Sequence, residues 1–161
     1  MLELYLLRHG KAARPENYAK DFERPLNKKG VAQLNQLGYR LRAEEIKISQ
    51  LISSSAQRTK ETAIIANHFL TIPDVSYEKE LYLADHETIR KFICYAAKKP
   101  SLLYVGHNFG ISDLCSYLSG ESISMSTGML VKLNFDFDDW SLISADTGKV
   151  EWIYESDVYI P

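Results

Sequence analysis

The chain has 161 residues, of which 45% are hydrophobic and 25% are charged. This length suits one domain with a substantial core, and the composition is typical of a globular protein rather than of a disordered or fibrous one. Nineteen basic and twenty-one acidic side chains give a formal net charge of -2, so the overall charge favours neither nucleic-acid nor membrane binding. We expect a single domain over residues 1–161, and without a recognisable leader or membrane-spanning run the cytoplasm is its default location.

The first predicted element is a buried strand over residues 2–7, which form a short apolar run. This run stops abruptly on Arg8, His9 and Gly10, so a cation and an imidazole should lie at the end of the strand. The polar residues 11–27 that follow contain two prolines and predict a loop packed over this strand end.

A helix should begin after Asn27, which can act as its N-cap, and run to about Glu45. Its apolar positions recur at helical spacing at Val31, Leu34, Gly38 and Leu41. After a brief strand at residues 50–52, the hydroxyls of Ser53–Ser55 are candidates for capping a second helix. Arg58 then falls in the first turn of that helix, beside its exposed amides.

The middle of the chain repeats this alternation of strand and helix. Residues 75–77 predict a short strand, and Asp85 can cap a third helix. The strongly apolar residues 102–106 predict a second buried strand, which stops on His107 and Asn108. The first strand stops on an arginine and a histidine in the same way.

The C-terminal part changes character after a fourth helix closed by Gly120. Residues 129–135 alternate between apolar and more polar positions, and residues 150–154 predict a final strand near an edge of the sheet. The whole pattern indicates an α/β fold, a three-layer α/β/α sandwich around a mostly parallel sheet whose last strands can run antiparallel. Cys94 and Cys115 lie in apolar helical patterns without metal-type spacing, which favours buried thiols over a disulfide.

Three strand-to-helix junctions carry the polar side chains Arg8, His9, Arg58 and His107. In such sheets these junctions share one edge, and ligands bind there. The group is cationic and lacks a carboxylate cluster, so it fits a phosphoryl group better than a metal ion or an acyl centre. An imidazole with one unprotonated nitrogen can attack phosphorus while arginine forks hold the oxygens. His9 is therefore the candidate nucleophile, and we expect no metal and no cofactor.

Three segments together carry a family resemblance: Leu-Arg-His-Gly at residues 7–10, the serines, arginine and closing Thr-Ala of residues 54–63, and Val-Gly-His-Asn at residues 105–108. In this order, and over nearly the whole chain, they resemble the histidine phosphatase superfamily. The resemblance implies a phosphoglycerate mutase-like fold and a nucleophilic His9. The phosphate pocket that it implies consists of Arg8, Arg58 and His107.

Within that superfamily the chain is similar to the small SixA-type phosphohistidine phosphatases, both in length and in the first-loop segment that begins at Asp21. The mutase branch carries a glutamate proton donor where this chain has Leu83. An alkoxide leaving a phosphate monoester needs a proton, and the acid that supplies it typically raises the rate ~10²- to 10⁴-fold. The P–N bond of phosphohistidine is labile, so its cleavage needs less help from an acid. Glu80, Asp85 and Asp21 remain alternative acids.

These observations predict a metal-independent phosphatase acting on phosphohistidine of a partner protein, and a monomer that binds neither nucleic acid nor membrane. Two alternatives stay open: a phosphatase for small phosphomonoesters, and a phosphoprotein-binding module without turnover. Asp21 is either a substrate contact or a turn cap, and Asn108 is either a substrate contact or the cap of the fourth helix. His68 and His86 have no partner motif and are interpreted as surface residues.

Overall fold

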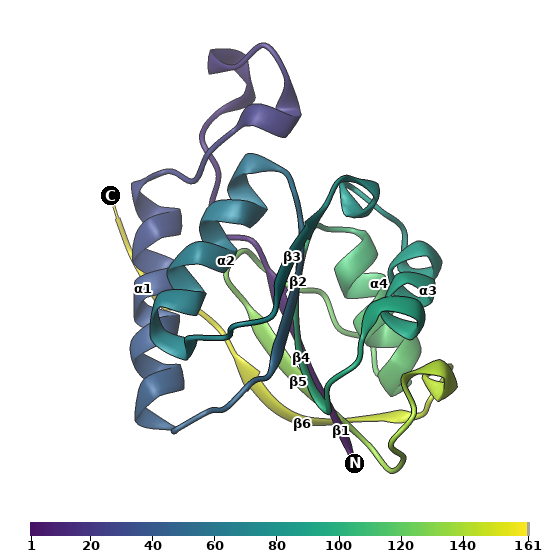
Figure 1. Cartoon of the computed structure of the whole chain (residues 1–161). Helices are drawn as coiled ribbons and strands as arrows, with labels where there is room; N and C mark the ends of the chain where they lie inside the picture. The colour runs from purple at the N-terminus through teal and green to yellow at the C-terminus, as the bar shows by residue number, and fades with distance from the viewer. Residues whose placement is uncertain (161) are drawn as a thin grey trace.

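The computed structural model describes residues 1–160, so Pro161, the last residue of the expected domain, lies outside the described residues. Strands and helices alternate along the chain as predicted (Figure 1). The strands are β1 (Leu2–Arg8), β2 (Gln50–Ser54), β3 (Val75–Glu78), β4 (Ser101–Gly106), β5 (Leu130–Phe135) and β6 (Gly148–Tyr154). The helices are α1 (Lys28–Ala43), α2 (Gln57–Leu70), α3 (His86–Ala96) and α4 (Gly110–Ser119). Short 3-10 helices lie at Pro15–Asn17, Asp21–Glu23, Lys79–Leu81 and Trp140–Leu142.

The strands form one mixed sheet in the order β3-β2-β4-β1-β5-β6. The first four strands of the chain pair in parallel, whereas β5 runs antiparallel to β1 and β6 runs antiparallel to β5. Figure 1 views this sheet close to edge-on, with α1 and α2 on one side and α3 and α4 on the other. The predicted three-layer sandwich with a mostly parallel sheet and an antiparallel C-terminal edge is therefore confirmed.

Two hydrophobic cores, one on each face of the sheet, hold the layers together. Along β1, Leu4 and Leu6 pack with α3 and α4, while Tyr5 and Leu7 pack with α1 and α2. This division follows from the alternation of side chains along a strand that is covered on both faces. A fully buried leucine contributes roughly 1.5–3 kcal/mol, so the apolar runs of β1 and β4 anchor the strand ends that carry the polar residues.

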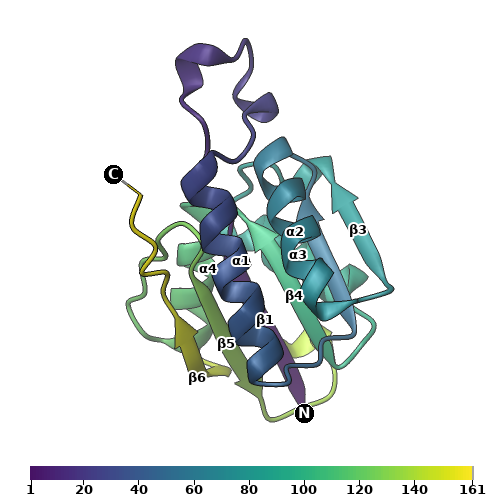
Figure 2. The same cartoon turned by 90° about the vertical axis from the view of Figure 1, so that its left-hand side faces the viewer.

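The two central parallel strands, β1 and β4, lie side by side, and the connections that leave them run to opposite faces of the sheet. The helix that follows β1 packs on one face of the sheet, and the helix that follows β4 packs on the other (Figure 2). Connections that part in this way leave a crevice at the carboxyl ends of the strands, where ligands of such sheets bind. His9 follows β1 directly and His107 follows β4 directly.

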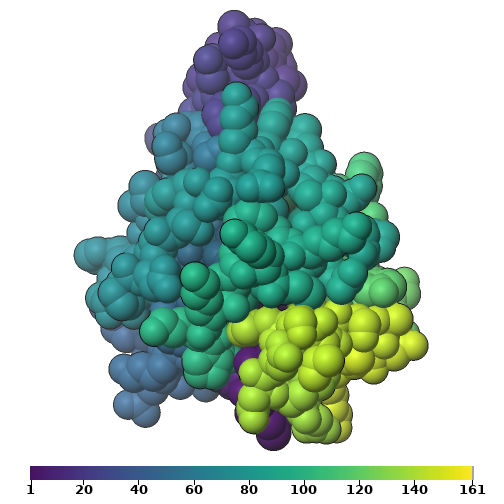
Figure 3. Space-filling model, turned by 45° about the vertical axis from the view of Figure 1, so that its right-hand side comes forward, coloured from purple at the N-terminus to yellow at the C-terminus, as the bar shows by residue number. Residues whose placement is uncertain are grey.

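The segment between β1 and α1 projects beyond the body of the molecule at this same end, as Figure 3 also shows. An isolated bridge between Ala12 and Leu26 closes its base. Gly30 allows the start of α1 to approach this base closely, because a Cβ there would lie 2.2 Å from the carbonyl oxygen of Lys11. A loop over residues 11–27 is thus confirmed, with two 3-10 helices inside it, but much of it projects from the body of the molecule instead of packing over the strand end as predicted.

Two details of the helix predictions were wrong. Val31 was assigned to the apolar face of α1, but its side chain is 40% exposed, and Leu37 belongs to the core instead. Ser53–Ser55 do not provide the N-cap of α2, which is Ala56, without a side-chain cap hydrogen bond. Asn27 and Asp85 do cap α1 and α3, by accepting from the backbone N–H groups three residues further on. None of the helices in residues 1–160 has the length and apolar character needed to cross a membrane.

Candidate active site

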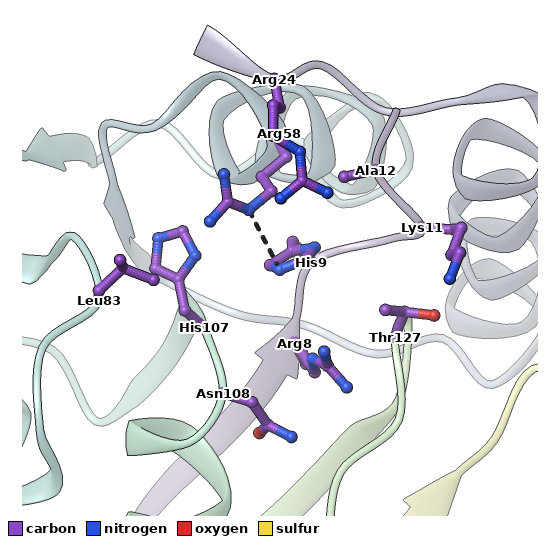
Figure 4. A pocket seen from close by; sticks show the side chains of 10 residues that line it. All are labelled: Arg8, His9, Lys11, Ala12, Arg24, Arg58, Leu83, His107, Asn108 and Thr127. Carbon is purple, nitrogen blue, oxygen red and sulfur yellow. Dashed lines mark hydrogen bonds between the residues drawn. The ribbon is translucent and has the colours of Figure 1, made fainter. Parts of the chain in front are cut away.

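The carboxyl ends of β1 and β4 and the first turn of α2 surround a cavity of about 220 Å³ (Figure 4). Its lining residues are Arg8, His9, Lys11, Ala12, Arg24, Arg58, Leu83, His107, Asn108 and Thr127. The cavity therefore brings together all four residues of the predicted pocket, from three segments far apart in the sequence, and it adds Asn108. Asp21 does not line it, but lies behind Arg58.

His9 is buried, with 7% of its surface exposed, and its ring has a defined orientation. Its Nδ1 lies 2.6 Å from the carbonyl oxygen of Gly10, an atom that can only accept a hydrogen bond. The proton of the neutral ring is therefore on Nδ1, and Nε2 carries the lone pair. The Nε–H of Arg58 donates to this Nε2 over 3.3 Å, as the dashed line in Figure 4 marks.

Burial lowers the pKa of His9 to about 3. The Gly10 carbonyl opposes this shift, while the neighbouring charges of Arg58 and Arg8 reinforce it. His9 is consequently neutral at physiological pH, so its Nε2 stays unprotonated. The backbone beyond it is held by Thr62 of α2, whose hydroxyl accepts from the N–H of Gly10 over 3.1 Å.

Arg58 is 4% exposed and is held by a carboxylate from the projecting loop. Its Nη2 lies 3.0 Å from Oδ2 of Asp21, and its Nη1 donates to the Asp21 carbonyl oxygen over 2.9 Å. The same carboxylate accepts from Nη1 of Arg24 over 2.8 Å and from the hydroxyl of Tyr82. Asp21 thus orients two of the arginines of the cavity, a role that neither of its predicted interpretations included.

The hydrogen bonds of Asp21 also determine whether it can act as a proton donor. Burial alone would raise the pKa of Asp21, but hydrogen bonds from Tyr82, Arg24 and Arg58 outweigh it and hold that pKa well below the usual range. Such a group is a poor proton donor at neutral pH. The other two alternatives, Glu80 and Asp85, do not line the cavity, and Asp85 is engaged as the cap of α3.

Arg8 and Asn108 approach the cavity beside each other, and both donate to the carbonyl oxygen of Met125, over 2.9 Å and 3.1 Å. The Nε of Arg8 is buried without a hydrogen-bond partner in residues 1–160. The predicted capping role of Asn108 was wrong: its Oδ1 accepts from the Ser112 hydroxyl over 2.5 Å, and the cap residue of α4 is Phe109. Local geometry decides this, because Asn108 is the first residue of the turn that precedes the helix.

His107 is 2% exposed and lies close to His9, with 5.4 Å between the ring centroids. Its Nε2 is 2.8 Å from the hydroxyl oxygen of Ser54, while its Nδ1 is buried and has no hydrogen-bond partner in the described part of the chain. Burial lowers the pKa of His107 to about 2, with further contributions from His9 and Arg58. Both histidines are therefore neutral at physiological pH.

The cavity combines four cationic side chains, from Arg8, Lys11, Arg24 and Arg58, with two neutral imidazoles, and no carboxylate lines it. Among residues 1–160, no group of three or more histidine, cysteine or carboxylate side chains is placed to hold a metal ion. Four cations around a small polar cavity fit a multiply charged anion such as a phosphoryl group.

Several residues of the site were not predicted. Lys11, Arg24 and Thr127 reach the cavity from loops, and Thr62 was noticed only as part of a motif. The one available signal was the concentration of basic residues just after the first strand. His68 is exposed on α2 as predicted, whereas His86 is partly buried and packs against Tyr117 with 5.3 Å between ring centroids.

Residues 4–82, just under half of the chain, match the model of the histidine phosphatase superfamily (branch 1), so this part of the chain is similar to that superfamily. Two uncharacterized relatives are SYNPCC7002_A2622 of Picosynechococcus sp., 29% identical over 66% of this chain and 66% of its own length, and ML1117 of Mycobacterium leprae, 27% identical over 80% and 81%.

Solved structures with similar folds include candidate phosphohistidine phosphatases named SixA. That of Nakamurella multipartitia has a TM-score of 0.86 at 21% identity and covers 98% of this chain and 97% of its own. That of Agrobacterium tumefaciens has a TM-score of 0.84 at 23% identity and covers 96% and 98%. This chain therefore shares the fold of SixA-type proteins, which is the phosphoglycerate mutase-like histidine phosphatase fold.

Proposed function

We propose that the chain is a phosphatase that works through a phosphohistidine formed on His9. The observation that carries this proposal is the state of the ring: the Gly10 carbonyl holds the proton on Nδ1, and the unprotonated Nε2, which accepts from Nε of Arg58, lies at a cavity lined by four cations. A neutral imidazole with an oriented lone pair is a competent nucleophile, and preorganised cations stabilise the charge of the transferring phosphoryl group.

The proposed reaction has two steps. In the first, a bond forms between His9 Nε2 and phosphorus while the bond from phosphorus to the leaving group breaks. Arg8, Arg58 and His107 hold the phosphoryl oxygens. In the second, a water oxygen attacks phosphorus, the P–Nε2 bond breaks, and inorganic phosphate leaves with the neutral imidazole restored. No metal takes part in either step, so we expect chelators to leave turnover unchanged.

The proposed substrate is phosphohistidine on a partner protein. Leu83 stands in the cavity wall and offers no proton, and the nearby carboxylate of Asp21 is held ionised. A leaving imidazole needs less protonation than a leaving alkoxide, so the site suits a P–N bond better than a P–O bond. The similar folds named as phosphohistidine phosphatases support the same substrate class.

Rapid-quench labelling tests the covalent step. With a ³²P-labelled phosphohistidine peptide, wild-type protein should trap acid-labile phosphate within the first turnover, and His9→Ala should trap none. His68→Ala, which changes an exposed histidine on α2, is the matched control and should label like wild type. Equal labelling of His9→Ala and wild type would contradict the proposal, as would the absence of hydrolysis by all three proteins.

A panel of substrates tests the proposed preference for phosphohistidine. Phosphohistidine peptide, phosphoserine peptide and sugar phosphates should be compared with one preparation of the protein. We expect the highest kcat/KM for phosphohistidine. A preference for a phosphomonoester would keep the mechanism and replace the substrate.

A further inference from the structure

Ser54 connects the second strand to the active site. It is the last residue of β2 and is fully buried, with 0% of its surface exposed. Its hydroxyl oxygen lies 2.8 Å from Nε2 of His107 and 3.3 Å from the backbone nitrogen of Ala56. The serine that was expected to cap a helix therefore has an imidazole as its shorter contact.

The direction of the contact to His107 follows from counting protons. A serine hydroxyl has one proton to donate and can accept two hydrogen bonds. The Ala56 N–H donates to Ser54, so that contact uses an acceptor position. Within residues 1–160 the Ser54 hydroxyl meets no other hydrogen-bonding atom, and its burial keeps solvent away. Its proton is therefore directed at Nε2 of His107. The opposite direction would leave both the serine proton and the Nδ1 lone pair of His107 without a partner among the described residues, whereas this direction leaves only the Nδ1–H unpaired.

This direction determines the tautomer of His107. A neutral imidazole has a single N–H, so a ring whose Nε2 accepts a hydrogen bond must carry its proton on Nδ1. The ring is neutral because burial and the adjacent His9 and Arg58 lower its pKa to about 2. A charged ring would donate from both nitrogens, whatever Ser54 did.

The protonated nitrogen is the one that faces the cavity. His107 lines the cavity, and its Nδ1 is buried without a protein partner among the described residues. In Figure 4 one nitrogen of the His107 ring is turned towards Arg58 and His9 and the other is turned away from them. Since Nε2 is engaged by Ser54, the nitrogen on the cavity side is Nδ1.

We propose that Ser54 is a positioning residue, which fixes His107 as the Nδ1–H tautomer and so presents a neutral hydrogen-bond donor to a phosphoryl oxygen. The identity of the acceptor rests on the proposed function, whereas the tautomer does not. Without the serine hydroxyl, the Nε2–H tautomer becomes accessible, and that tautomer turns a lone pair towards the negatively charged oxygen. A lone pair there repels the group that the site must hold.

Nitrogen NMR measures the tautomer directly. Uniformly ¹⁵N-labelled protein contains only four histidines, and His107→Asn identifies the signals of His107. In the wild type we expect the Nδ1–H pattern, with Nε2 as the unprotonated nitrogen. In Ser54→Ala we expect the Nε2–H form to appear. Ser53→Ala is the matched control, because the hydroxyl of this equally buried neighbour donates to backbone carbonyl oxygens and forms no hydrogen bond with His107.

Kinetics completes the test. With the phosphohistidine peptide, Ser54→Ala should lower kcat about tenfold, the lower end of the loss that follows removal of the partner that orients a metal-bound histidine, and Ser53→Ala should not. A wild-type Nε2–H pattern would overturn the inference even if turnover were normal. So would a Ser54→Ala protein with unchanged tautomer and unchanged kcat. Absence of turnover in the wild type would contradict the proposed function instead, and the NMR result would still decide the tautomer.

Discussion

The ends of the two central strands present the same side chain in opposite ways. His9 and His107 are both buried and neutral, and their rings are 5.4 Å apart. Behind His9 stands the carbonyl oxygen of Gly10, which can only accept. Behind His107 stands the hydroxyl of Ser54, which donates in the arrangement that we infer. The cavity therefore receives a lone pair from one ring and an N–H from the other.

In each ring, the partner atom of the nitrogen that points away from the cavity determines what the nitrogen on the cavity side can do. Both rings lose their charge through burial beside arginines, so charge does not distinguish them. The distinction lies in one partner atom behind each ring. The proposed nucleophile and the proposed hydrogen-bond donor are thus the same kind of residue at equivalent positions of adjacent strands.

Replacing each histidine by asparagine should separate the two proposed roles. His9→Asn should lower kcat by roughly 10⁴-fold or more, since it removes the proposed nucleophile. His107→Asn should lower it by roughly 10²- to 10³-fold, as is typical for the loss of one donor to a developing charge. In single-turnover rapid-quench experiments His107→Asn should still form acid-labile phosphate, but slowly. Equal losses, or no labelled intermediate in His107→Asn, would show that the two roles are not separate.

The shared neutrality of the rings predicts how stability depends on pH. The pKa values of His9 and His107, about 3 and about 2 in the folded protein, lie below the ordinary value of 6.5. Below pH 6.5 the unfolded chain therefore binds more protons than the folded protein. As the pH is lowered through this range, the free energy of unfolding should fall by ~1.4 kcal/mol per pH unit for each histidine. Urea denaturation between pH 7 and pH 4.5 measures this slope.

Comparison of variants separates the histidines from other titrating groups. His107→Asn should flatten the slope by one histidine's share, and His68→Asn, which changes an exposed residue, should leave it unchanged. If His107→Asn kept the full wild-type slope, His107 would not be a buried neutral ring.

Asp21 acts on His9 through Arg58, which it orients by two hydrogen bonds and which donates to Nε2 of His9. Asp21→Asn keeps the shape of the side chain but loses the charge that orients Arg58, so kcat should fall about tenfold. Inorganic phosphate should bind no more weakly, because the cavity becomes more positive. Calorimetry and steady-state kinetics measure the two quantities. Asp136→Asn, an exposed change beyond the far end of β5, is the control, and weaker phosphate binding by Asp21→Asn would show that the carboxylate has another role.

The four residues that were predicted for the pocket share a property that makes them visible in a sequence. Each ends or directly follows an apolar strand, or lies in the first turn of a helix, so the order of local elements alone places it at one edge of the sheet. Lys11 and Arg24 lack this property, because a loop can direct its side chains anywhere. Their arrival at the cavity depends on the bridge between Ala12 and Leu26 and on the contact of Arg24 with Asp21.

Serine and asparagine were the residues that local reasoning placed wrongly. Their short polar side chains can cap a helix or contact a more distant group, and the sequence allows both. Ser54 and Asn108 both lie beside helix starts, and each uses its shortest hydrogen bond on another side chain, His107 and Ser112 respectively. Only the packing of β2 against β4, and of the turn before α4, decides between these uses.

The smallest predicted effect concerns the missing acid beside His107. Leu83 lines the cavity, is 54% exposed, and already has a left-handed backbone with φ of 51°. Leu83→Glu places a carboxyl group there without a new backbone demand. Because this position is half open to water, the carboxyl should be protonated appreciably only in mild acid. Turnover of a phosphoserine peptide should therefore rise about threefold at pH 5.5 and less at pH 7, with no gain for phosphohistidine. Leu83→Gln has the same size and no transferable proton, so an equal gain in that variant would assign the effect to shape rather than to proton donation.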